Sequence, residues 1–240
     1  MEWSYIYLTL IMKNILTQSL AKYFLPGGNV QVTGHNYDKK AGSANMLNAT
    51  RSAMILISHF FSPINALAGK PVFTVSANSV VVHVFYYVSD ANQALNSYTV
   101  NNLGEALSSI FNRPVELRLV KLHYPYLDGH ILAQFIAMNT QDYTLAQILR
   151  RLFGSVSPIK NIDSANVLVS DLPSHIVGIK VRVSGRLMME RSRPRQTVQT
   201  QQIGSFSKNN LALVDNASFT TKNKKGAFTV KVWISQRAVV

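Results

Sequence analysis

The spacing of apolar side chains changes along the chain, and each change predicts a different kind of element. Residues 4–24 have apolar side chains at helical spacing, and residues 48–61 contain an apolar run that fits a buried helix; a proline shortly after each segment ends the predicted helix. The polar residues 29–48 between them, rich in Asn, Gly and Lys, predict a loop. Residues 71–75 and 80–87 are rich in β-branched and aromatic side chains, which predicts a β-hairpin.

The middle of the chain predicts a further helix and a further strand. Asn101 or Asn102 can cap a helix over residues 103–111, because an asparagine side chain accepts a hydrogen bond from a free N–H group in the first turn. Residues 115–120 alternate between apolar and polar side chains, as a half-buried strand does. Residues 49–122 are thus predicted to run helix, strand, strand, helix, strand.

The last part of the chain predicts two helices and then strands. Residues 129–138 and 144–153 have amphipathic helical spacing, and residues 154–174 form a connection rich in Pro, Ser and Asn. Three strands and a basic turn are predicted beyond this connection: residues 178–187, 195–205 and 227–234, with the turn at residues 222–226. The elements together predict a mixed α/β fold.

The charge of the chain is strongly positive and unevenly placed. Its 240 residues carry a formal net charge of +13. Residues 180–240 hold twelve Lys and Arg but only Glu190 and Asp215, whereas residues 1–179 hold twelve Lys and Arg and nine acids. Such an excess favours a polyanionic partner, because each neutralised phosphate releases condensed counterions. A solvated basic face without a partner remains the alternative.

The sequence lacks the patterns of common enzymes and metal sites. It has no cysteine, and its six histidines show no H-x-x-x-H spacing. The motifs G-x-S-x-G and H-E-x-x-H and a phosphate-binding glycine loop are absent. The acids of the middle and later chain are scattered without paired spacing: Asp128, Asp142, Asp163 and Asp171. We therefore predict no catalysis, no cofactor and no bound metal.

Membrane and targeting signals are also missing from the sequence. No apolar run reaches the roughly eighteen residues that a membrane-spanning helix needs. The first 25 residues lack the positive start of a secretory signal and the Arg-rich character of a mitochondrial transit peptide. Two possibilities stay open: the protein is made where it works, or its import depends on another kind of signal.

Residues 178–187 have the pattern of a strand with one apolar and one basic face. Ile179 and Val181 point to one side, whereas Lys180 and Arg182 point to the other. One face can join a core while the other presents cations to phosphates. Arg186, near the end of this segment, can bind a phosphate through two hydrogen bonds. Arg191, Arg193 and Arg195 follow at every second position, and this spacing suits an extended arm along an RNA backbone.

The same residues carry a family resemblance. The segment Gly-Ile-Lys-Val-Arg-Val-Ser-Gly-Arg-Leu at 178–187 resembles the signature strand of small-subunit ribosomal protein three, and residues 228–234 resemble the closing strand of that family. Residues 113–117, 122–128 and 131–133 resemble the mitochondrially encoded fungal members. The resemblance covers about residues 49–240, and residues 1–48 match nothing in it.

The resemblance implies a fold and a domain order. A KH-type αββααβ domain over residues 49–140 would follow an N-terminal extension (1–48), and a basic α/β domain with a mostly antiparallel sheet would occupy residues 141–240. A KH domain grips a nucleic-acid strand with a Gly-x-x-Gly loop. Residues 89–100, which stand in the corresponding place, contain no glycine. We therefore expect a degenerate, mainly structural KH domain.

The resemblance also implies a function. The chain is expected to be a structural constituent of the mitochondrial small ribosomal subunit, in the mitochondrial matrix, where it binds rRNA in the head near the mRNA entrance and supports assembly. Its implied partners are small-subunit rRNA, neighbouring small-subunit proteins and mRNA. The candidate phosphate contacts are Lys180, Arg182, Arg186, Arg191, Arg193, Arg195, Lys224, Lys225 and Lys231.

Arg150 and Arg151 are candidates for the mRNA entrance. In bacterial relatives basic residues on the helix before the signature strand line this entrance; the first family pair falls here at the uncharged Ala146 and Gln147, and the next at Arg150 and Arg151. The alternative is an exposed helix end, where cations lie favourably near the negative end of the helix dipole.

An RNA-binding factor that acts off the ribosome, of a maturase-like or mRNA-regulatory kind, is the second interpretation. Such a factor would usually show an intact KH loop or RNA-stacking aromatics beside basic residues. The aromatic side chains of residues 80–87 could stack bases, but packing within a sheet explains them better.

Overall fold

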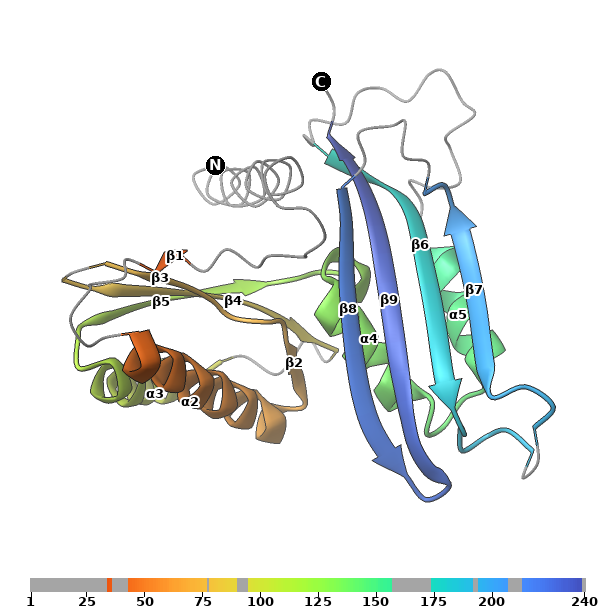
Figure 1. Cartoon of the computed structure of the whole chain (residues 1–240), viewed down its shortest axis with the longest axis horizontal. Helices are drawn as coiled ribbons and strands as arrows, with labels where there is room; N and C mark the ends of the chain where they lie inside the picture. The colour runs from red at the N-terminus through yellow and green to blue at the C-terminus, as the bar shows by residue number, and fades with distance from the viewer. Residues whose placement is uncertain are drawn as a thin grey trace. The chain divides into compact units, whose positions relative to one another are not determined.

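A computed structural model describes residues 34–35, 43–76, 78–89, 95–156, 174–191, 194–206 and 213–238 (Figure 1). The predicted helix over residues 4–24 and the candidate Arg193 lie outside the described residues. The chain divides into two compact units, one of residues 33–132 and one that contains residues 133–240. Mixed helices and strands in both units confirm the α/β class.

The first unit, residues 33–132, is a mixed sheet with two helices on one face (Figure 1). Its elements are β1 (Gly34–His35), α2 (Ser43–Phe61), η1 (Ser62–Ile64), β2 (Ala66–Ala68), β3 (Val72–Val75), β4 (Val80–Val88), α3 (Ser97–Phe111), β5 (Val115–Lys121) and η2 (Pro125–Leu127). The long strand β4 is central: β2 and β3 pair antiparallel with it, and β5 pairs parallel. The KH-type assignment itself stays a prediction.

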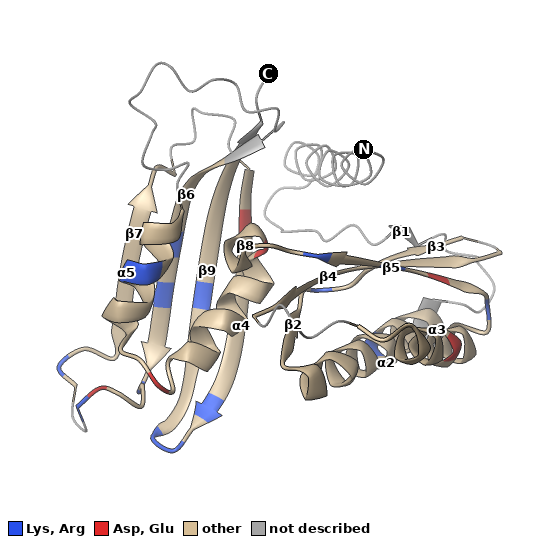
Figure 2. Ribbon diagram, turned by 180° about the vertical axis from the view of Figure 1, so that it is seen from behind, with Lys and Arg blue, Asp and Glu red and all other residues tan. Residues whose placement is uncertain are grey.

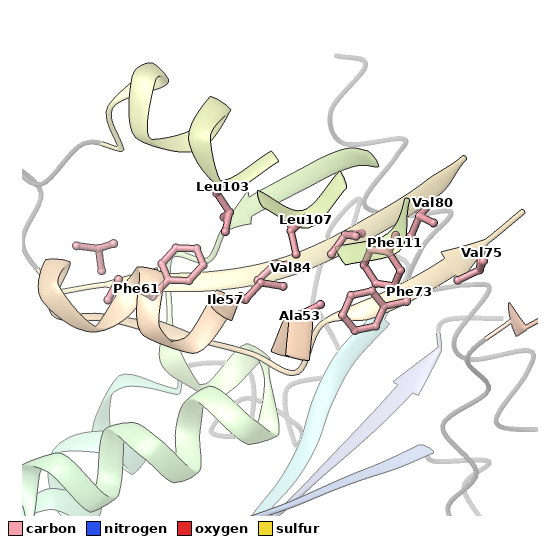
Figure 3. Close-up of a cluster of buried hydrophobic side chains, with 13 residues drawn as sticks. Ala53, Ile57, Phe61, Phe73, Val75, Val80, Val84, Leu103, Leu107 and Phe111 are labelled. Atoms are coloured by element: carbon pink, nitrogen blue, oxygen red, sulfur yellow. The ribbon is translucent and has the colours of Figure 1, made fainter. Parts of the chain in front are cut away.

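The core of the first unit lies between the sheet and its two helices. Ile57 and Phe61 of α2, Leu107 of α3, and Phe73 and Val84 of the sheet form one buried cluster (Figure 3). Each is at most 1% exposed. Shortening such a buried leucine to alanine costs about 2–5 kcal/mol, so this cluster is sufficient to hold α2 and α3 on the sheet.

The predicted first residues of helices α2 and α3 were wrong. Helix α2 begins at Ser43, so residues 43–48 are helical rather than part of a loop, because Met46 and Ala49 pack against the core and extend its buried face. Helix α3 begins at Ser97, and its cap is Asn96, whose Oδ1 accepts a hydrogen bond from the N–H of Tyr98 at 3.2 Å. The predicted caps Asn101 and Asn102 lie inside that helix instead.

The second unit is a four-stranded sheet covered on one face by helices. Its elements are α4 (Gly129–Asn139), most of which belongs to this unit, α5 (Leu145–Ser155), β6 (Ser174–Gly185), β7 (Val198–Gly204), β8 (Leu213–Asn223) and β9 (Gly226–Ala238). The strand order is β7-β6-β9-β8, and every pair is antiparallel, as expected for the C-terminal part. Figures 1 and 2 show α4 and α5 on the same face of this sheet.

The sheet of the second unit has one apolar face. Ile179, Val181 and Val183 of β6 pair with Ile234, Val232 and Val230 of β9, and each of these six side chains is almost fully buried. Leu149 and Leu152 of α5 are buried as well. The strict alternation that the sequence shows in residues 179–183 therefore corresponds to one face packed under helices and one face without them.

The predicted bounds of β6 were wrong, and β8 was absent from the predicted elements. Strand β6 ends at Gly185, two residues earlier than expected, because Gly185 adopts φ +124° and turns the chain. Strand β8 was not predicted at all, because its side chains are mostly small or polar and only half-buried on the inner face. As an edge strand it needs little apolar surface. Among the described residues, no helix is long and apolar enough to cross a membrane.

Candidate nucleic-acid interface

The face of the four-stranded sheet opposite α4 and α5 carries the basic residues of the signature strand; we call it the open face. Arg182 of β6 stands directly opposite Lys231 of β9, and both are exposed. Lys180 stands opposite Trp233, and its Nζ lies 5.6 Å from the centroid of the indole ring, a cation–π contact. Alternation along both strands places these four side chains on the same surface of the sheet.

The neighbours of these cations on the open face are neutral. The residues in register on the two outer strands are Gln202 and Thr200 of β7 and Asn216 and Ser218 of β8. None of the residues in register with Lys180, Arg182 or Lys231 is acidic. Like charges directly opposite each other on a sheet are destabilising. The open face is therefore an arrangement that a bound anion would stabilise.

The chain turns sharply at the end of β6, and Gly185 is the residue that permits the turn. It has φ +124°, a region that L side chains rarely adopt, and a Cβ placed there would lie 2.7 Å from the Ala227 carbonyl oxygen and from Phe228. Its own N–H donates to the Thr197 carbonyl at 2.8 Å. This glycine directs Arg186 and the following residues away from the sheet.

Residues 186–191, which follow the turn, are held in place by the hairpin turn between β8 and β9. The Asn223 side-chain amide donates to the Arg186 carbonyl at 2.8 Å. The Lys225 ammonium donates to the carbonyls of Met188 at 2.8 Å and Glu190 at 2.5 Å. The Gln199 amide of β7 donates to the Glu190 carboxylate. A segment without secondary structure thus has defined anchors on both of its neighbouring strands.

These anchors gather exposed cations at one end of the sheet (Figure 2). The exposed members are Arg186, Arg191, Arg195, Lys222 and Lys224. Lys222 belongs to the predicted basic turn at residues 222–226 but was not among the predicted phosphate contacts; it occupies an exposed position of β8. Lys225 differs from the others, because it is half-buried and its ammonium already has two main-chain acceptors.

Comparison with known proteins places this chain in a family. A family model of mitochondrial ribosomal proteins (VAR1) matches residues 66–237. The small ribosomal subunit protein uS3m of Mycosarcoma maydis is 35% identical over 189 residues, which cover 70% of this chain and 68% of that protein. The chain belongs to the mitochondrial ribosomal protein (VAR1) family. The expected membership of the small-subunit ribosomal protein three family, in its mitochondrial form, is confirmed.

Membership of the VAR1 family makes the chain a structural protein of the mitochondrial small ribosomal subunit rather than an enzyme. The described part of the chain also contains no group of three or more His, Asp or Glu side chains that could hold a metal ion. Burial, and secondarily the charge of Lys70, lowers the pKa of His130 to about 4. That imidazole is consequently neutral at physiological pH.

Arg150 and Arg151 lie apart from the open face. They are exposed on α5, which packs against the opposite face of the sheet, and the Arg151 guanidinium lies 4.7 Å from the centroid of the Tyr143 ring. The alternative explanation, a stabilising position at the helix end, was wrong, because α5 continues to Ser155 and its last turn contains no basic residue. The dipole effect falls off beyond the last turn.

Proposed function

We propose that this VAR1-family chain binds rRNA of the mitochondrial small subunit through the open face and the cation-rich end of its four-stranded sheet. The observation that carries the proposal is the direct opposition of Arg182 and Lys231 with only neutral residues in register around them. Phosphate oxygens supply the missing negative charge, and arginine can bind them through two parallel hydrogen bonds. The segment 186–191 extends this surface along a second stretch of backbone.

We also place the chain in the subunit head, where it supports assembly beside the mRNA entrance. The resemblance of residues 178–187 and 228–234 to the ribosomal protein three family supports this placement. Binding is electrostatic and geometric: a rigid sheet holds cations at fixed spacing against folded rRNA, which stabilises that fold. Arg150 and Arg151, on the opposite side of the same unit, are available for mRNA.

The test is incorporation of a charge-neutralised variant, R182Q/K231Q, into small subunits. We expect it to leave the small-subunit fraction at moderate salt, where the unaltered chain stays bound, because each lost phosphate contact weakens binding. The salt slope of binding should also fall by about 1 for each lost contact. Sedimentation of mitochondrial lysate at low and moderate salt measures this.

Two controls make the result specific. R182K/K231R keeps both charges and should remain in the subunit. R51Q/K70Q removes two exposed charges from the unit of residues 33–132 and should also remain. Retention of R182Q/K231Q at moderate salt would exclude the open face as the main contact. Sedimentation of the unaltered chain with a few transcripts, away from the subunit, would favour an RNA-binding factor that acts off the ribosome.

A further inference from the structure

The unit of residues 33–132 carries an aromatic stack that the proposed function does not use. Between β5 and α4 the rings of Tyr124 and Tyr126 lie 5.1 Å apart at an interplanar angle of 12°, which is a stacked geometry. The His123 ring lies 6.5 Å from that of Tyr124 at an angle of 50°. Tyr124 thus lies between a stacked ring, that of Tyr126, and a tilted one, that of His123.

One tyrosine of the stack is buried and the other is half-exposed. Tyr126 is only 6% exposed and Pro125 is buried, whereas Tyr124 is 52% exposed. Leu122, just before the stack, is buried, and its N–H donates to the Tyr86 carbonyl of the central strand at 2.8 Å. Burial, and secondarily the neighbouring Tyr124, raises the pKa of the Tyr126 phenol. The half-exposed ring of Tyr124 is therefore stacked on a buried partner, the ring of Tyr126.

The chemistry around Tyr124 favours a nucleic-acid base as the occupant of its outer face. Every base has a flat π-face that stacks on a tyrosine ring, and such stacking tolerates any sequence. Lys121 and His123, within three residues of Tyr124, are exposed and can contact the phosphates beside a stacked base. The core of a protein–protein interface is instead usually depleted of charge.

We propose that Tyr124 stacks on an unpaired base of the RNA that the chain binds. This inference rests on the proposed function, in which that RNA is small-subunit rRNA. The contact would anchor the near-neutral unit of residues 33–132, which has seven Lys and Arg and five acids, by stacking rather than by charge. It would also take the place of the Gly-x-x-Gly grip of KH domains, for which residues 89–100 have no glycine.

The first experiment places a photo-crosslinking phenylalanine analogue at position 124 of the full chain in assembled subunits. We expect an adduct that ribonuclease shortens and that maps to one unpaired nucleotide. An adduct that only protease removes would overturn the proposal, because a neighbouring protein would then occupy the ring. An adduct to an RNA other than rRNA would uphold the stacking and contradict the proposed function, so the two failures remain distinguishable.

The second experiment compares chemical reactivity of rRNA nucleotides in subunits that carry Y124A, Y124F or Y98A. Tyr98 is 69% exposed on α3 and serves as a matched exposed tyrosine outside the stack. We expect one unpaired nucleotide to become about tenfold more accessible in Y124A, since a base stack contributes roughly that factor, and to be unchanged in Y124F and Y98A. An unchanged nucleotide pattern in Y124A, or the same change in Y98A, would count against the stack.

Discussion

Two adjacent lysines in the β8–β9 turn have different surroundings. Lys224 is exposed, whereas the ammonium of Lys225 donates to two carbonyls of the segment 186–191. Hydrogen bonds from a charged donor are stronger than neutral ones, and a carbonyl left without its donor is costly where it is shielded from water. Lys225 therefore holds this basic segment in position, and Lys224 is the better candidate for a phosphate.

Replacement of Lys225 by methionine should loosen the segment 186–191, while replacement of Lys224 should not. Methionine keeps most of the aliphatic stem but removes the donor, at a local cost of about 1.5–3 kcal/mol. Local opening would rise at least about tenfold, and with it the rate at which an arginine-specific protease cleaves after Arg186 and Arg191 in the full chain. K224M is the control. Equal cleavage rates in the two variants would mean that the hydrogen bonds of Lys225 do not restrain the segment.

The sequence predicted the sides of residues on β6 correctly but not the role of Lys225. Strand alternation has a fixed period of two, so Ile179 and Arg182 could be assigned to opposite faces from local pattern alone. The acceptors of the Lys225 ammonium lie 37 and 35 residues away, and the Arg186 carbonyl that accepts from Asn223 lies 37 residues away. No local pattern identifies a lysine that binds main-chain carbonyls across such a separation.

Strand β8 is a whole element that the local pattern of apolar residues did not predict. Its inner positions are half-buried and include Asp215, Ala217 and Phe219, a weak apolar pattern that packing against β9 makes sufficient. Strand β9 could be predicted because Val230, Val232 and Ile234 are strongly apolar and stand at every second position. The structure shows that all three are fully buried. The central strands of the sheet were therefore predictable, and the edge strand that completes the open face was not.

The turn that ends β6 gives a testable consequence for stability. Gly185→Ala should destabilise the chain by at least about 2 kcal/mol, because the side chain must adopt φ +124° and would approach the backbone of residues 227–228 to 2.7 Å. Gly154→Ala, on α5 in the same unit, has nothing within 4 Å of the new methyl group and should be neutral or stabilise by up to about 1 kcal/mol. Thermal unfolding of both variants under identical conditions measures the difference. Equal midpoints would show that the turn relaxes without strain.

The two units of the molecule differ strongly in net charge. Residues 133–240 hold fifteen Lys and Arg against five acids, whereas residues 33–132 hold seven against five. Composition alone predicted where the charge lies. It could not predict that the basic unit has two separate cationic surfaces, because that depends on which face of the sheet α5 covers.

These two surfaces should have separable roles in translation. R150Q/R151Q changes exposed residues of α5 and leaves the open face intact, so we expect its subunits to assemble normally and to sediment with the chain bound. Photo-crosslinks between mRNA and this chain should fall several-fold, because the two cations that would attract the message are gone. R182Q/K231Q should give the converse result, with loss of incorporation at moderate salt and unaltered crosslinking per incorporated chain. If R150Q/R151Q instead failed to assemble, α5 would belong to the rRNA contact, and the molecule would bind folded RNA on both sides of its sheet.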